Sequence, residues 1–83
     1  MTIFTHVSAE CMSSTKCSSV MEFAEANGLE VVGCGIDCGM MALVVYGNAN
    51  TASKIVPFVH DINGGNYCKA ELISEEEFEE LCQ

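Results

Sequence analysis

Hydrophobic positions are densest in residues 28–47, which contain two apolar runs of strand length, 29–35 and 40–46. Residues 36–39 between the runs include aspartate and glycine, which favour a tight turn, so the stretch predicts a β-hairpin. The second run is apolar at consecutive positions, whereas a strand with one face in water alternates apolar and polar residues. We therefore expect both of its faces to be covered, either because the strand is central in its sheet or because a second subunit packs on it. In the second case Met41, Leu43 and Val45 would form the oligomer interface.

A strand and a helix are predicted before the hairpin. Residues 2–7 mix β-branched and aromatic side chains, a composition typical of strands. Over residues 8–27 the apolar positions recur every three or four residues, as on the buried side of a helix. Ser8 is the expected N-cap of this helix and Gly28 the residue that ends it.

A second helix and another strand are predicted after the hairpin. Apolar positions from residue 52 to residue 62 again follow helical spacing, but Pro57 cannot donate a backbone hydrogen bond inside a helix. Either the helix begins near Ser53, with Pro57 in its first turn, or it kinks at the proline. Residues 67–73 then alternate apolar and polar side chains, which predicts a half-buried strand.

The last part of the chain predicts a short acidic helix. Ser74 and Glu77 have the spacing of a capping box, in which each side chain binds the other residue's backbone N–H group. Phe78, Leu81 and Cys82 would share the apolar side of this helix.

The predicted order is strand, helix, strand, strand, helix, strand, helix. A chain of 83 residues is too short for two independent cores, so we expect residues 1–83 to form a single α+β domain. The order resembles the ferredoxin-like βαββαβ arrangement, which implies an antiparallel sheet with helices on one face, here with a short acidic C-terminal helix added. This architecture serves enzymes, metal carriers, ligand sensors, RNA binders and inhibitors, so it does not select a function.

Charge narrows the possible partners. Twelve acidic residues against three lysines and no arginine give a formal net charge of −9. Such a chain repels nucleic acids and anionic membranes and attracts basic protein surfaces. It contains neither a run of about 20 apolar residues nor a signal for export, so we expect a cytoplasmic protein without direct contact to nucleic acid or membrane.

The six cysteines invite a metal or disulfide hypothesis. Cys34 and Cys38, with His6 or His60, offer ligands for zinc, but their spacing differs from the paired C-x-x-C of zinc ribbons. Buried cysteine usually behaves as a small apolar residue, so we expect no metal and no cofactor. We expect the thiols to be mostly reduced, with a disulfide framework as the alternative.

No catalytic motif is evident. A catalytic histidine needs a nucleophile within hydrogen-bond distance. Nothing in the sequence places one of the thiols beside His60 and Asp61. Gly33 and Gly35 lead into the hairpin instead of a helix N-terminus, which argues against a phosphate-binding loop and favours turn glycines. We therefore expect a protein that is not an enzyme.

Acidic side chains are the main candidate for function. Half of the carboxylates fall between Glu71 and Glu80. A solvated surface explains any single glutamate, but the scarcity of lysine and arginine favours a surface of one sign that docks on a basic groove. The candidate partner-binding residues are Glu75, Glu76, Glu79, Glu80, Glu22 and Glu25.

Two functional hypotheses follow from the sequence. The first is an inhibitor that imitates nucleic acid and docks on a basic, nucleic-acid-binding partner. In size and charge it is similar to the small acidic anti-restriction and anti-CRISPR inhibitors of phages and mobile elements. The alternative is a homo-oligomeric regulatory domain that binds a small ligand or metal. A homodimer is compatible with both.

Overall fold

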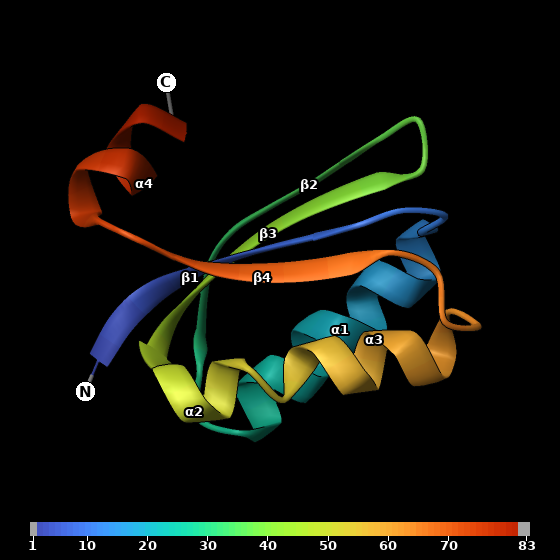
Figure 1. Cartoon of the computed structure of the whole chain (residues 1–83), viewed down its shortest axis with the longest axis horizontal. Coiled ribbons are helices and arrows are strands. Elements are labelled where there is room, and N and C mark those ends of the chain that lie inside the picture. Colours follow the sequence, from blue (N-terminus) through green and yellow to red (C-terminus); the bar gives the residue numbers. More distant parts are fainter. Residues whose placement is uncertain (1, 82–83) are drawn as a thin grey trace.

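The computed structural model describes residues 2–81, which form a four-stranded antiparallel sheet with helices on both faces (Figure 1). Helices α1, α2 and α3 cover one face, called here the inner face, and α4 lies on the opposite, outer face. None of the helices within residues 2–81 is long and apolar enough to cross a membrane. The elements are β1 Thr2–Ala9, α1 Ser14–Ala26, β2 Glu30–Asp37, β3 Met40–Asn48, α2 Ala49–Ala52, α3 Ile55–Ile62, β4 Cys68–Ile73 and α4 Glu75–Leu81.

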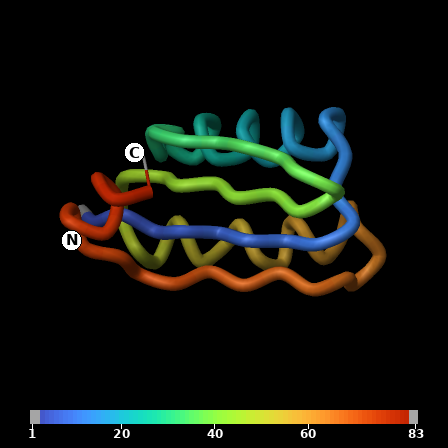
Figure 2. Tube along the Cα trace, turned by 90° about the horizontal axis from the view of Figure 1, so that it is seen from above, coloured from blue at the N-terminus to red at the C-terminus, as the bar shows by residue number. Residues whose placement is uncertain are grey.

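The predicted hairpin is confirmed, with a tighter turn than expected. β2 and β3 are joined by Cys38 and Gly39, whose φ angles of 51° and 80° suit a two-residue hairpin turn. The strand order is β2-β3-β1-β4, so β3 lies between β2 and β1 (Figure 2). The prediction that β3 is an interior strand is therefore confirmed.

The side chains of β3 alternate between the two faces of the sheet. Met41, Leu43 and Val45 are at most 1% exposed and belong to the hydrophobic core beneath the inner face. This corrects their assignment to an oligomer interface, because side chains buried within their own chain cannot contact a second subunit. Ala42 and Val44 point to the outer face instead.

α1 begins later than predicted. β1 continues through Ala9, and Ser13 caps the helix by accepting a hydrogen bond from the Lys16 backbone N–H at 3.2 Å. Ser8, the expected cap, is instead paired with both β3 and β4 in the sheet. The chain turns toward α1 at Cys11, which has a left-handed φ of 59°.

The sequence left open whether the second helix begins shortly before Pro57 or kinks at it, and the structure shows the first. Pro57 lies in the first turn of α3, where its missing N–H group costs no intrahelical hydrogen bond. Ile55 and Val59 of this helix are fully buried in the core. Phe58 stacks on Phe23 of α1 with ring centroids 4.2 Å apart, which joins the two helices.

A buried asparagine connects the end of α3 to the first half of the fold. Asn63 Oδ1 accepts a hydrogen bond from Lys16 Nζ at 2.7 Å, and its Nδ2 donates to the Glu10 carbonyl oxygen at 2.7 Å. Asn63 is 3% exposed, so these bonds satisfy polar atoms that are removed from water. One of the three lysines is therefore engaged in holding the fold together.

Candidate functional site

α4 is held against the outer face by its cap and by an aromatic contact. The Ser74 N–H donates to Glu77 Oε1 at 3.2 Å, and the Glu77 N–H donates to Ser74 Oγ at 3.1 Å, which confirms the predicted capping box. Phe78 stacks on Phe4 of β1 with ring centroids 4.7 Å apart and ring planes 12° from parallel. The Phe4 ring also packs against the Tyr46 ring of β3, with ring centroids 4.8 Å apart. These contacts fix where the glutamates of α4 project.

Removing the cap is expected to loosen α4 without unfolding the sheet. Ser74→Ala deletes the hydroxyl that binds the Glu77 N–H, and the loss of an N-cap costs about 1 kcal/mol. α4 has no fully buried residue, so we expect its amides to exchange with deuterium about fivefold faster. The denaturation midpoint of the whole chain should stay unchanged.

The matched control for this prediction is Ser13→Ala, which removes the cap of α1. Cys17, Val20 and Ala24 anchor α1 in the core, so this variant should lower the stability of the whole fold. Equal exchange rates for α4 in Ser74→Ala and in the wild type would contradict the role of the capping box.

The negative charge of the protein lies at its surface and is largely uncompensated. All twelve aspartate and glutamate side chains are exposed. Within residues 2–81, the ion pair between Lys69 Nζ and Glu71 Oε2, at 3.3 Å, is the sole salt bridge. An exposed pair of this kind contributes about 0–1 kcal/mol, so it neutralises charge locally without organising the surface.

Two shallow hollows beside α4 are lined both by glutamates of α4 and by glutamates of the neighbouring strands. On the β4 side, Glu71 lines a hollow together with Glu77 and Glu80. On the β2 side, Glu30 lines a second hollow with Glu75. We call the resulting group the α4 acidic surface, and it comprises Glu30, Glu71, Glu75, Glu76, Glu77, Glu79 and Glu80.

The six sequence-predicted partner-binding residues fall into two groups. Glu75, Glu76, Glu79 and Glu80 lie on α4, whereas Glu22 and Glu25 lie on α1 across the sheet (Figure 1). Both groups are exposed, but one flat partner surface cannot contact opposite faces of the sheet. The structure therefore separates the two α1 glutamates from the α4 acidic surface.

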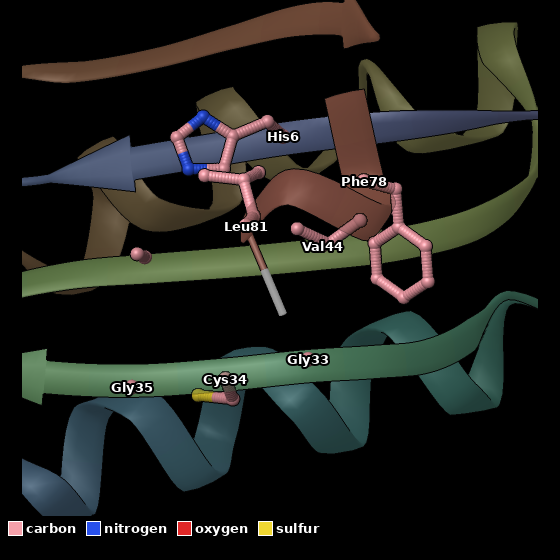
Figure 3. A pocket seen from close by; sticks show the side chains of 8 residues that line it. His6, Gly33, Cys34, Gly35, Val44, Phe78 and Leu81 are labelled. Atoms are coloured by element: carbon pink, nitrogen blue, oxygen red, sulfur yellow. The ribbon is translucent and has the colours of Figure 1, made fainter. Parts of the chain in front are cut away.

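An apolar hollow next to α4 was not anticipated from the sequence. Its volume is about 280 Å³, and Figure 3 shows it between α4 and strands β1, β3 and β2. Gly33 and Gly35 were expected as turn residues, but both belong to β2, where their missing side chains leave the outer face open. We call this hollow the sheet trough. Its floor is Gly33, Gly35 and Ala42, and it is bordered by His6, Cys34, Val44, Phe78 and Leu81.

The thiols do not assemble into a site within the described residues. Cys11, Cys17, Cys34, Cys38 and Cys68 are free cysteines, and Cys82 lies outside the described part of the chain. Among residues 2–81, no three side chains of histidine, cysteine, aspartate or glutamate are arranged to hold a metal ion. His60 is exposed on α3, across the sheet from His6 on the outer face.

The buried thiols make stability depend on pH. Burial raises the pKa of Cys17 above its ordinary value of 9.0, and the nearby Cys34 thiolate adds to the shift. Partial burial also raises the pKa of Cys34 and Cys68. A thiol with a raised pKa in the folded state ionises more readily after unfolding. Its contribution to the stability of the folded state is therefore complete below pH 9.0 and is lost as the pH rises further.

We therefore expect the urea midpoint to be the same at pH 6 and pH 8 and lower at about pH 10. Cys17→Ala removes the most buried thiol within residues 2–81 and should reduce this alkaline loss, which assigns that part of the loss to the Cys17 thiol. An identical alkaline loss in Cys17→Ala and in the wild type would contradict the assignment.

No protein-family model matches the chain, and no curated protein sequence matches it either. The exposed charges and the shape of the surface are therefore the features that point to a function.

Proposed function

We propose that the protein is a small, non-enzymatic protein-binding module that docks through the α4 acidic surface on a basic surface of its partner. The observation that carries this proposal is the gathering of seven exposed carboxylates around α4, with a salt bridge to Lys69 as their sole ion pair within residues 2–81. Charges of one sign concentrated on one face attract an oppositely charged surface and accelerate association with it.

The partner we propose is a nucleic-acid-binding protein. Carboxylates three or four residues apart on a helix are about 5–6 Å from each other, so α4 presents a dense row of negative charge. A groove that attracts phosphates with lysine and arginine attracts such a row for the same electrostatic reason. The protein would act as a cytoplasmic inhibitor by occupying that groove, as in the anti-restriction or anti-CRISPR type.

We also propose that the fold is ferredoxin-like. The strand order β2-β3-β1-β4, antiparallel throughout, supports this assignment, as do the two longer helices α1 and α3 on the inner face. In this view α2 and α4 are additions. The α4 acidic surface then occupies the face that α1 and α3 leave open.

The alternative of a homo-oligomeric regulatory domain is less well supported. Its expected interface was the apolar hairpin, but Met41, Leu43 and Val45 are buried in the core. A second copy would also bring the same net charge of −9 to any contact.

The test is capture of a partner with the immobilised protein, followed by elution with increasing salt. We expect the captured protein to bind nucleic acid, to leave the column between about 0.05 and about 0.5 M salt, and to lose its nucleic acid when the acidic protein is added. Retention that is unchanged across this range would contradict an electrostatic contact.

A further inference from the structure

The sheet trough is open because residues without long side chains form its floor. Gly35 pairs with Ala42, and both belong to the outer face. A Cβ atom placed on Gly35 would have no heavy atom of the described part of the chain within 4 Å, apart from its chain neighbours, so the space above this glycine is open there. A Cβ on Gly33 would only reach Phe78 and Val44 at 4.0 Å.

The trough is large enough for one side chain of a partner. Its volume is about 280 Å³, which is close to the lower limit of the about 300–1,000 Å³ of pockets that enclose a small molecule. Phe78 and Leu81 of α4 border the trough, and Leu81 remains 56% exposed although it is apolar. An apolar side chain inserted there would remove Leu81 from water.

Charge around the trough indicates what carries that side chain. Glu77 and Glu80 line the neighbouring hollow with Glu71, and Leu81 borders both that hollow and the trough. Lys69, which is on the same strand as Glu71, is already paired with it at 3.3 Å. A segment that enters the trough therefore passes beside Glu77 and Glu80, which form no salt bridge within residues 2–81. A basic segment gains from this passage, whereas a second copy of this acidic chain is repelled.

We propose that the sheet trough receives one apolar side chain from a basic peptide segment of the partner, while the lysines or arginines on either side of it contact the α4 acidic surface. This inference rests on the proposed function and adds the anchor that charge alone does not provide. Charge pairs at an exposed rim mainly set the rate of association, whereas a buried apolar anchor contributes much of the affinity.

Gly35→Val is the variant that tests the trough. Valine suits a strand, and the space above Gly35 accepts it, so the variant should fold while its side chain fills the trough. Ala42→Val fills the same floor from β3 and serves as a second variant. Cys34→Val is the matched control. Cys34 also borders the trough, but it pairs with the core residue Leu43 and lies close to the Cys17 thiol of α1, so its side chain is directed to the inner face.

The probes are two synthetic peptides that differ at one position: a phenylalanine flanked by lysines on both sides, and the same peptide with alanine in place of the phenylalanine. We expect the phenylalanine peptide to bind the wild type and Cys34→Val equally, and to bind Gly35→Val and Ala42→Val about tenfold more weakly. The alanine peptide should bind all four proteins with the same, weaker affinity.

The outcomes separate this inference from the proposed function. Equal binding of both peptides to wild type and Gly35→Val would overturn the trough as an anchor site and leave the acidic docking surface intact. Binding of neither peptide at low salt would overturn both proposals. A dimer of the wild type that Gly35→Val converts to monomer would show that a second copy occupies the trough, and would also overturn the inference.

Discussion

Leu43→Ala is expected to destabilise the protein by about 3 kcal/mol, the typical cost of deleting a buried leucine side chain. Leu43 is 0% exposed and lies in the core cluster with Val7 and Val20. A small domain has a total stability of about 5–15 kcal/mol, so this loss is a large fraction of the whole. Urea denaturation followed by circular dichroism measures it.

Leu72→Ala is the matched control for this prediction. Leu72 lies on edge strand β4 and is 62% exposed, so the same substitution should change stability by less than about 0.5 kcal/mol. Equal effects of the two variants would contradict the assignment of Leu43 to the hydrophobic core. A Leu43→Ala protein of unchanged stability that has lost a dimer would restore the interface hypothesis.

Neutralising α4 is expected to slow association with the basic partner by about tenfold to a hundredfold. The variant replaces Glu75, Glu76, Glu79 and Glu80 with glutamine, which keeps side-chain size and helix preference. Glu77 is retained because its carboxylate caps the helix. Stopped-flow or surface-based kinetics at low salt measure the association rate.

A matched pair of double variants separates local charge from net charge. Glu79→Gln with Glu80→Gln removes the same charge as Glu22→Gln with Glu25→Gln, but from the outer face instead of α1. Only the double variant on α4, Glu79→Gln with Glu80→Gln, should slow association with the partner substantially. If both pairs slow it equally, the partner responds to the total charge of the protein and not to the α4 acidic surface.

Much of the fold follows from local patterns. The hairpin was predicted because the turn residues lie between two apolar runs, and the capping box because Ser74 and Glu77 have its spacing. The start of α1 was wrong because Ser8 can cap a helix or continue a strand. Pairing with β3 and β4 keeps Ser8 in the strand. Both partner strands are distant in the sequence, so the residues near Ser8 do not predict this pairing.

The candidate site was predictable only in part. Helical periodicity identifies the apolar side of α4, but the face of the sheet that this side covers depends on the stacking of Phe78 on Phe4. That contact joins opposite ends of the sequence. For the same reason, the sequence did not separate Glu22 and Glu25 from the α4 glutamates, and it did not reveal that Gly35 floors a trough.

The amide chemical shifts of the isotope-labelled protein, followed during titration with its captured basic partner, map the contact surface directly. We expect the largest shifts in α4 and at Glu71, with little change along α1 at Glu22 and Glu25. Shifts concentrated on α1, with α4 unaffected, would contradict the claim that the α4 acidic surface is where the partner binds.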